Sequence, residues 1–532
     1  MVITMDYNKV YSDWLCNCTE YKAQLLTMKD EEIKSAFCTE LTFGTAGLRG
    51  IMGAGTNRMN ERVVRRASAG LADWLRGRCD SPSAVIAYDT RNNSRDFAEA
   101  SARILAGAGI KTYIFDRPAP VPLLSFAVRD LGCDAGIVIT ASHNRKEYNG
   151  YKVYNSIGGQ ITDKDADDIL AEIRRHDYLS PLPVSDDIET VPERIRELYI
   201  KSVRDTVGAG ASSASVVYTP LNGSGRDYVT EVLKSMPVAE LNCVEQQMPV
   251  DGNFPTCPYP NPEKQEVYML AEEIAAGCGA DVCIATDPDS DRAGVKVLHN
   301  GEYVLLTGNE IGTLILNYLC ETAGDVSGRT LVTTIVSSPL VDRIAEAYGV
   351  SVVRTLVGFK YIGEQMELLG DRFLFGFEES NGFLAGNYTR DKDGVFAAAT
   401  IARMTGYYKD QGRDLIDVLE EIYDKYGRCV CRQVSVEKDG GPIMQALRNA
   451  GGAGFGAYEK PARADAVMTD YSQSVNGLPA ADILSFECGD GSRLIVRPSG
   501  TEPKVKLYAA ASDNDRIDEL LGIFTSITGE AL

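Results

Sequence analysis

One short pattern occurs three times in this chain, and it restricts the possible folds more than any other feature. Each copy joins a Gly-containing turn, an Asp, a short apolar run rich in β-formers, and a polar loop. The copies are "LGCDAGIVITASHN" ending at Asn144, "CGADVCIATDPDSD" ending at Asp291 and "LLGDRFLFGFEESNG" ending at Gly382. Repetition over so long a period indicates duplicated domains, because the repeats of a solenoid are far shorter.

A second apolar run precedes each copy, and amphipathic segments separate the runs. The upstream runs are "SAVIAYDTR", "SASVVYTPLNGSG" and "RTLVTTIVSSPL". Continuous apolar strands that alternate with amphipathic helices are typical of parallel sheets covered on both faces. Ligands of such sheets bind beyond the carboxyl ends of the strands. We therefore expect the three polar loops to converge on one cleft.

The pattern changes after Arg428. "RCVCRQVSVEKDGG" alternates polar and apolar residues, and a hairpin is expected to turn at Gly489–Gly491. The predicted fold class is α/β: three related α/β domains with mixed, mostly parallel sheets, plus a smaller α+β C-terminal domain around a central cleft. The predicted boundaries are 1–207, 208–326, 327–428 and 429–532. Four domains suit 532 residues, given about 150 residues per domain.

Charge and composition exclude several classes of protein. A formal net charge of −21 argues against nucleic-acid and anionic-membrane partners, which need a basic surface. No apolar run approaches the roughly 20 residues needed to span a bilayer, and the N-terminus lacks the apolar core of a signal peptide. The 13 Cys form no C-x-x-C pair, and there are only three His. We expect a cytoplasmic protein with reduced thiols.

The second repeat carries "TDPDSDR", with Asp287, Asp289 and Asp291 at alternate positions. Three converging carboxylates repel one another unless a hard cation holds them. An EF-hand is rejected, because Arg292 and Leu298 occupy the places of its Gly and Glu. An Asp-nucleophile phosphatase fits poorly, because Asp291 stands where a small residue is needed. Mg²⁺ is therefore expected here, with room for a phosphate oxygen; a solvated acidic turn is the alternative.

The first repeat ends in "TASHN", with Ser142 beside His143. We expect no useful hydrogen bond between these adjacent side chains, and a lone serine at a strand end usually caps or turns the chain. Lys146 and Lys152 follow in the same loop, and the acidic loop occupies the matching place in the next repeat. These neighbouring cations and carboxylates favour Ser142 as a phosphoryl carrier, with Mg²⁺ neutralising the charge of the phosphoryl group during transfer.

The remaining loops suit a sugar and a phosphate. "GFEESNG" offers Glu378, Glu379 and Ser380, and a carboxylate can accept hydrogen bonds from sugar hydroxyls; an exposed acidic turn is about equally compatible. "RPSGTEPK" offers an Arg, hydroxyls and a Gly-exposed backbone that can nest a phosphate, although a basic turn that binds nothing is the alternative. The Gly-rich "FGTAGLRG" is a weak signal by itself.

In this order, "FGTAGLRG", "TASHNRKEYNGYK", "TDPDSDR", "GFEESNG" with "RDKDG", and "RPSGTEPK" resemble the α-D-phosphohexomutase superfamily along nearly the whole chain. The closest resemblance is to the branch of phosphoglucomutase/phosphomannomutase and phosphopentomutase. It implies a catalytic phosphoserine at Ser142 and Mg²⁺ held by Asp287, Asp289, Asp291 and an oxygen on Ser142.

The resemblance also implies the substrate contacts. Sugar recognition falls to Glu378 and Ser380, and the cleft is lined by Arg49, Lys152, Arg292 and Lys392. Phosphate recognition falls to Arg497, Ser499, Gly500, Thr501 and Lys506. Lys392 and His143 are candidates for proton transfer. The chain departs from the family at Arg145, where proline is usual; proline would fix φ and stiffen the serine loop.

The expected function is reversible conversion of glucose 1-phosphate to glucose 6-phosphate, with phosphomannomutase activity, through phosphoserine and a sugar bisphosphate. Expected cofactors are Mg²⁺ and glucose 1,6-bisphosphate, and the expected partners are small sugar phosphates, in a monomer or homodimer. Phosphopentomutase or glucose 1,6-bisphosphate synthase activity would share almost every motif. A metal-dependent phosphatase and a catalytically silent regulator are more distant alternatives.

Overall fold

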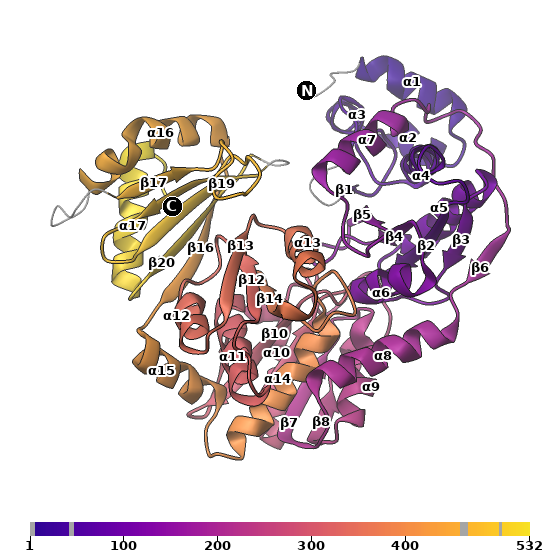
Figure 1. Ribbon diagram of the computed structural model, residues 1–532. Helices are drawn as coiled ribbons and strands as arrows, with labels where there is room; N and C mark the ends of the chain where they lie inside the picture. The colour runs from indigo at the N-terminus through magenta and orange to yellow at the C-terminus, as the bar shows by residue number, and fades with distance from the viewer. Residues whose placement is uncertain (1–5, 42–46, 458–465, 500–502) are drawn as a thin grey trace.

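Four β-sheets, each with its own helices, form an open arc in which the first and last units stand at the two ends (Figure 1). The computed structural model describes residues 6–41, 47–457, 466–499 and 503–532. Three of the sheets mix parallel and antiparallel pairs, and the fourth is antiparallel throughout. The predicted fold class is confirmed. Each sheet also lies inside one of the four predicted ranges, whose boundaries themselves stay predictions.

The first unit contains a six-stranded sheet of order β1-β5-β4-β2-β3-β6. Its strands are β1 Leu48–Ile51, β2 Ser83–Tyr88, β3 Lys111–Ile114, β4 Ala135–Ile139, β5 Tyr148–Asn155 and β6 Ile188–Thr190. Its helices are α1 Tyr7–Asn17, α2 Lys22–Thr27, α3 Asp30–Phe37, α4 Glu61–Arg76, α5 Ser94–Gly107, α6 Val121–Leu131, α7 Asp163–Ile173 and α8 Glu193–Val207.

The second and third units have smaller sheets, of order β11-β10-β9-β7-β8 and β13-β12-β14-β15. The second contains β7 Ser212–Thr219, α9 Gly225–Ser235, β8 Val238–Cys243, α10 Met269–Cys278, β9 Val282–Thr286, β10 Ala293–His299 and β11 Glu302–Leu305. The third contains α11 Gly308–Thr322, β12 Thr330–Thr334, α12 Leu340–Ala347, β13 Ser351–Thr355, α13 Phe359–Leu369, β14 Phe373–Glu378, β15 Gly382–Ala385, α14 Gly394–Lys409 and α15 Leu415–Tyr426.

The fourth unit is a five-stranded antiparallel sheet of order β16-β20-β19-β18-β17 with two helices. Its elements are β16 Val430–Val436, α16 Gly440–Ala457, β17 Val467–Asp470, β18 Leu484–Glu487, β19 Arg493–Pro498, β20 Val505–Ala511 and α17 Asn514–Thr528. β18 and β19 form the hairpin predicted around Gly489–Gly491.

The repeated Asp has a structural role in the first two units. Asp134 accepts a hydrogen bond from the backbone N–H of Ser83 at 2.8 Å, and Asp281 accepts one from that of Ser215 at 2.7 Å. In each case the carboxylate joins the start of one strand to the neighbouring strand. This explains why an Asp precedes the apolar run.

Each repeated loop contains a residue in the left-handed region of backbone space. Ser142, Ser290 and Asn381 have φ of 51°, 53° and 61°. This conformation costs a residue with a side chain roughly 1–2 kcal/mol, so packing must hold it. Part of this packing comes from Gly394, whose N–H donates to the Ser290 carbonyl at 2.9 Å. A Cβ on Gly394 would lie 2.7 Å from that carbonyl oxygen, so no larger residue fits.

The helix that starts at Gly394, α14, is buried along most of its length between the second and third units. Its capping residue Asp393 accepts hydrogen bonds from Tyr199 of α8 and from Tyr388, at 2.9 and 2.7 Å. The core therefore runs continuously beneath the loops. Among the described residues, no helix is long and apolar enough to cross a membrane.

Candidate active site

The serine loop begins where β4 ends, and its conformation brings two adjacent side chains together. Ser142 is 3 % exposed; its Oγ donates to Asp287 Oδ2 at 2.7 Å and lies 3.2 Å from His143 Nδ1. The expectation that these neighbours would make no useful hydrogen bond was wrong. The positive φ of Ser142 turns the chain sharply, so that its side chain and the next one share a side of the loop.

Asp287, Asp289 and Asp291 form a buried cluster whose carboxylate oxygens lie within 4.8 Å of one another. Burial, and then repulsion from the other two carboxylates, raises the pKa of Asp287 well above its usual value. Burial acts in the same direction on Asp289, but Lys152 and the hydrogen bond with Asp287 hold its pKa below the usual range. Repulsion among these buried carboxylates therefore favours a proton or a cation shared between them.

This cluster fits a divalent cation. Among the described residues, Asp289 Oδ1 and Asp291 Oδ1 are buried oxygens with no hydrogen-bond partner. Unpartnered buried carboxylate oxygens are costly, and three carboxylates beside a serine oxygen are the hard ligands that Mg²⁺ prefers. The donor set therefore suits the predicted metal.

Cations from two units face the acidic cluster. Lys152 Nζ of β5 lies 3.1 Å from Asp289 Oδ2, and Lys392 Nζ lies 2.9 Å from Asp291 Oδ2. Burial opposes the charge of Lys392, but Asp291 and Asp391 raise its pKa above the usual value, so it stays protonated. The cleft is therefore not uniformly acidic. Its cations allow an anionic ligand to bind although the whole chain has a net charge of −21.

Arg49 and Arg292 add two further guanidinium groups near the serine. Arg49 Nη1 lies 3.5 Å from Asn144 Oδ1, and Arg292 Nη1 forms an ion pair with Glu263 at 2.9 Å. Burial, and then these two guanidinium groups, lowers the pKa of His143 well below its usual value. This lowered pKa keeps the His143 imidazole uncharged at neutral pH.

Asp89 and Arg91 were missed as functional residues, although "YDTR" follows the first upstream run. Their side chains are fully buried and form an ion pair at 3.2 Å. Arg91 donates to the backbone carbonyls of Ser142, Asn144, Arg145 and Tyr148. One guanidinium thus fastens the whole serine loop, Arg145 included.

Thr140 and Asp391 were also missed. Thr140 Oγ1 lies 2.7 Å from Asp89 Oδ2 and 3.1 Å from Asp289 Oδ2, so it connects the Asp89–Arg91 pair with the acidic cluster. Asp391 accepts from Tyr154 at 2.8 Å, and its other oxygen lies 3.3 Å from Lys392 Nζ. The sequence signal for these two residues was only their polar character after an apolar run. It could not show their contacts, because the contacting residues are distant in sequence.

The sugar-loop candidates lie at the end of β14. Glu378 is buried and accepts from the backbone N–H of Gly358 at 2.9 Å, whereas Ser380 is half-buried. Burial raises the pKa of Glu378, with Lys392 and Arg292 opposing the shift. Burial, and then the charge of Glu378, raises the pKa of Glu379 to about 7.

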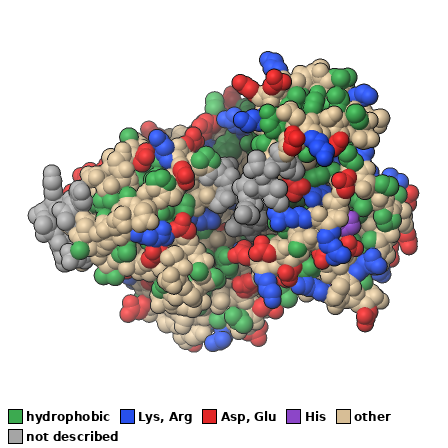
Figure 2. Space-filling view, turned by 90° about the horizontal axis from the view of Figure 1, so that it is seen from above, with side chains coloured by type: hydrophobic (Ala, Val, Ile, Leu, Met, Phe, Trp, Pro, Cys, Tyr) green, Lys and Arg blue, Asp and Glu red, His purple; other side chains and the backbone are tan. Residues whose placement is uncertain are grey.

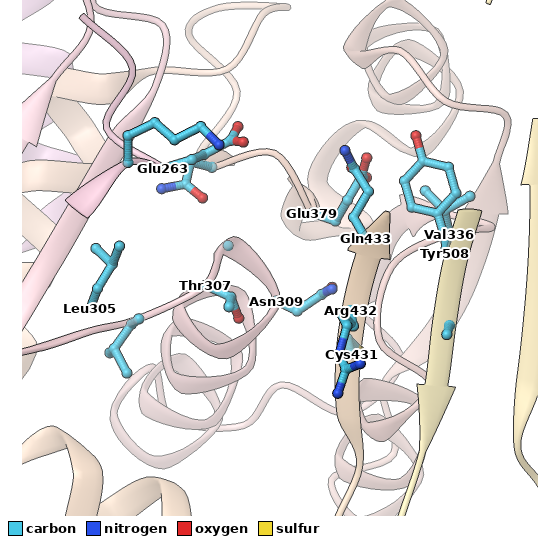
Figure 3. A pocket seen from close by; sticks show the side chains of 15 residues that line it. Glu263, Leu305, Thr307, Asn309, Val336, Glu379, Cys431, Arg432, Gln433 and Tyr508 are labelled. Carbon is cyan, nitrogen blue, oxygen red and sulfur yellow. The ribbon is translucent and has the colours of Figure 1, made fainter. Parts of the chain in front are cut away.

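Glu379 lines a cavity of about 310 Å³ where the second, third and fourth units meet (Figure 3). Glu263 and Thr307 line it from one side, and Cys431 and Tyr508 line it from β16 and β20. The fourth unit therefore contributes to the wall of the region that contains the sugar loop.

The phosphate-loop candidates lie on neighbouring strands of the fourth sheet. Arg497 of β19 pairs with Lys506 of β20, and the Ser499 N–H donates to the Lys504 carbonyl at 2.7 Å. Gly500 and Thr501 lie outside the described residues. Burial lowers the pKa of Lys506, which is near enough to Glu379 to feel its charge. Seen from above, Lys or Arg and Asp or Glu side chains are interspersed over the face of the molecule (Figure 2).

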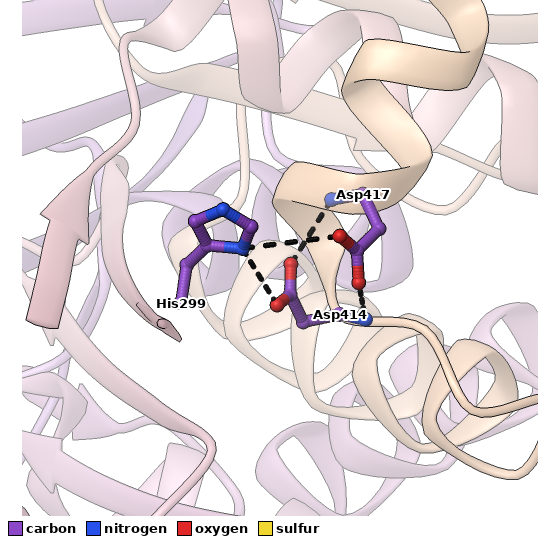
Figure 4. Close-up of side chains that lie close together, drawn as sticks. All are labelled: His299, Asp414 and Asp417. Atoms are coloured by element: carbon purple, nitrogen blue, oxygen red, sulfur yellow. Dashed lines mark hydrogen bonds and ion pairs between the residues drawn. The ribbon is translucent and has the colours of Figure 1, made fainter. Parts of the chain in front are cut away.

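A second cluster of potential metal ligands lies away from this cleft (Figure 4). His299 at the end of β10 contacts Asp414 at 2.8 Å and Asp417 at 3.9 Å. Asp414 caps α15 by accepting from the N–H groups of Ile416 and Asp417. These carboxylates are already used by the helix cap, so the cluster fastens α15 to the second unit.

Comparisons with known proteins agree with this arrangement. Four family models match: phosphoglucomutase/phosphomannomutase alpha/beta/alpha domain I at residues 40–180, domain II at 197–300, domain III at 307–426, and the C-terminal domain at 447–524. A Staphylococcus haemolyticus protein named phosphoglucomutase is 34% identical, covering 98% of each chain. A Haemophilus influenzae protein named "Probable phosphomannomutase" is 37% identical over 86% of this chain and 94% of its own.

Solved structures share the fold. A phosphoglucomutase/phosphomannomutase family protein from Burkholderia thailandensis superposes with a TM-score of 0.71 at 18% identity, covering 92% of this chain and 98% of its own. The four matched models and the full-length relatives define a protein of the phosphohexomutase class, in which a buried serine lies beside an acidic cluster that could hold a metal ion. This chain belongs to the phosphoglucomutase/phosphomannomutase family.

Proposed function

We propose that this protein interconverts glucose 1-phosphate and glucose 6-phosphate, and also acts on mannose phosphates, through phosphorylated Ser142. Phosphoserine transfers its phosphoryl group to a bound hexose monophosphate. The resulting sugar bisphosphate turns over in the cleft, and its other phosphoryl group returns to Ser142. Glucose 1,6-bisphosphate serves as intermediate and activator, and the enzyme works in the cytoplasm as a monomer or homodimer.

The observation that carries this proposal is the hydrogen bond from Ser142 Oγ to Asp287 Oδ2 at 2.7 Å. It places the candidate nucleophile against the acidic cluster of the next unit. Mg²⁺ bound by the three Asp residues and an oxygen on Ser142 would neutralise the charge of the transferring phosphoryl group. Lys392, held as a cation by its carboxylate neighbours, faces the same place and adds positive charge for the phosphoryl oxygens.

Proton transfer at Ser142 is assigned to His143. Its Nδ1 lies 3.2 Å from Ser142 Oγ, within the reach of a general base. With Asp287 engaged as a metal ligand, the Ser142 hydroxyl would donate to His143 Nδ1 instead of Asp287, and His143 would take its proton when the bisphosphate returns a phosphoryl group. When phosphoserine donates, the same group returns a proton to the leaving oxygen. Lys392 is then an electrostatic group rather than a base.

The substrate must be held in two orientations, so its two ends need separate contacts. Glu378 and Ser380 bind sugar hydroxyls. Arg497, Ser499 and Lys506, with Gly500 and Thr501, bind the phosphate that is not reacting. The fourth unit closes on this phosphate and excludes water, which would otherwise hydrolyse the phosphoryl group in transit.

Product analysis tests the proposal. ³¹P NMR follows glucose 1-phosphate with Mg²⁺ and a trace of glucose 1,6-bisphosphate, and the same assay is run with mannose and ribose phosphates. We expect glucose 6-phosphate to replace glucose 1-phosphate with no inorganic phosphate, and Ser142→Ala to be inactive. Stoichiometric release of inorganic phosphate would instead identify a phosphatase.

A further inference from the structure

Two cysteines lie at the connection between the third and fourth units. α15 ends at Tyr426, Gly427 has a φ of 85°, and β16 begins at Val430. Cys429 immediately precedes this strand and Cys431 is its second residue. Side chains two residues apart in extended chain point the same way. Any change in the angle of the fourth unit must act on this segment.

The two thiols contact each other and a serine of the third unit. Cys429 and Cys431 form a side-chain hydrogen bond, and Ser338 Oγ donates to Cys429 Sγ at 3.9 Å. Both sulfurs line a small cavity shared with Thr307 and Tyr423. The pair thus bridges the end of α15, the start of α11 and the start of β16.

The surroundings favour a thiolate on one of the two sulfurs. The hydrogen bond from Cys431 lowers the pKa of Cys429, and the charges of Arg343 and Arg493 act in the same direction, whereas burial opposes them. The same hydrogen bond raises the pKa of Cys431. Arg493 belongs to the fourth unit and donates to the Ser337 carbonyl of the third, so the cations are fixed across the junction.

The other buried cysteines offer a contrast. Burial raises the pKa of Cys133 to about 11, and that of Cys257, Cys283 and Cys320 to about 12. Such thiols are inert at neutral pH. Reactive cysteines lie in partly accessible, electropositive surroundings. Cys429 and Cys431 meet this description, because Cys431 is half-buried and the charges of Arg343 and Arg493 act on Cys429.

A path for a reagent exists. Cys431 is half-buried and lines the cavity of about 310 Å³ between the second, third and fourth units (Figure 3). Cys429 is less accessible than Cys431: it is 7 % exposed and lines the small cavity next to Cys431. A disulfide reagent that enters the cavity of about 310 Å³ therefore reaches Cys431, the half-buried member of the pair.

We propose that Cys429 is a modification site that forms a mixed disulfide with low-molecular-weight disulfides, and that Cys431 and Arg493 activate it. The Cys429 thiolate attacks one sulfur of the reagent; a protein–reagent S–S bond forms as the reagent's own S–S bond breaks. The other half leaves as a thiolate, and the proton of Cys429 has already passed to solvent. The added group occupies the hinge and holds the fourth unit away from the closed position.

The test uses the full-length protein and oxidised glutathione as the probe, with peptide mass mapping of all 13 cysteines. We expect Cys429 to be modified first and a thiol reductant to reverse the adduct. Cys431→Ala, which removes the donor, should slow the modification of Cys429 at least tenfold at pH 7. Cys278→Ser, at an exposed and distant thiol, is the matched control and should leave that rate unchanged.

Modification of Cys16 or Cys278 with Cys429 untouched would overturn the assignment. An unchanged rate in Cys431→Ala, with a native thermal unfolding curve, would overturn it as well. The labelling arm is independent of the proposed mutase activity. A second arm rests on that activity: the adduct should raise KM for glucose 1-phosphate, and Cys429→Ser should keep its activity and resist the reagent. An adduct on Cys429 that leaves both KM and kcat unchanged would contradict the claim that the added group holds the fourth unit away from its closed position.

Discussion

Ser142 Oγ donates a hydrogen bond to Asp287 Oδ2 at 2.7 Å, although the two residues are 145 positions apart. They lie at the ends of β4 and β9, equivalent strands of two repeated units. The candidate site is therefore assembled between units, and the packing of the first unit on the second determines the distance between Ser142 and the three Asp residues.

Asp287→Asn should lower turnover by about 10²-fold or more and weaken Mg²⁺ binding. Even residues that only orient metal ligands contribute 10–100-fold, and this change removes a ligand charge. Isothermal titration with Mg²⁺ and steady-state kinetics measure the two effects. Asp281→Asn changes a carboxylate of the same unit that bonds to Ser215 instead; equal losses in both variants would contradict the assignment.

Arg91→Ala should lower the free energy of unfolding by about 3–5 kcal/mol, because it leaves the buried Asp89 carboxylate without its partner. It should also reduce kcat, since the carbonyls of the serine loop lose their donor. Urea denaturation measures the stability. Arg95→Ala, at an exposed pair with Glu99, should cost less than about 1 kcal/mol; an Arg91 variant that behaves like it would show that the loop needs no such fastening.

Arg497→Ala should raise KM for glucose 1-phosphate by about 10- to 100-fold, because a hydrogen bond to a charged group contributes about 1.5–3 kcal/mol. Lys438→Ala removes an exposed cation of the same unit, paired with Glu530, and should leave KM unchanged. Steady-state kinetics distinguish the two variants. An unchanged KM in Arg497→Ala would move phosphate binding elsewhere.

The His299–Asp414 contact should make stability depend slightly on pH. The hydrogen bond with Asp414, helped by the charges of Asp417 and Glu420, raises the pKa of His299 above its ordinary value near 6.5. The contact therefore stabilises fully below about pH 6.5 and weakens as pH rises through the higher folded-state pKa. The difference in Tm between wild type and His299→Gln should shrink from pH 6 to pH 8. A constant difference would argue against protonation of this pair.

The sequence predicted the structure best where a pattern of one residue type, within a single segment, determines the local fold. The repeated Asp, the apolar runs and the alternate carboxylates of residues 287–291 predicted the sheets, their polar loops and the convergence of three carboxylates. These signals are local, since each lies within one strand and the loop that follows it.

Contacts across units could not be read in the same way. Nothing around Arg91 indicates that it reaches four carbonyls of a loop about 50 residues further on. The hydrogen bond between Ser142 and His143 depends on a left-handed φ that sequence favours only weakly for serine. Tertiary packing decides both features.

The central claim is that Ser142 carries the phosphoryl group. Peptide mass mapping of the purified protein, before and after adding glucose 1,6-bisphosphate and Mg²⁺, tests it most directly. We predict a single phosphate on the protein after the bisphosphate treatment, and we predict that it lies on Ser142. An active enzyme whose phosphate lies on another residue, or on none, would contradict the account.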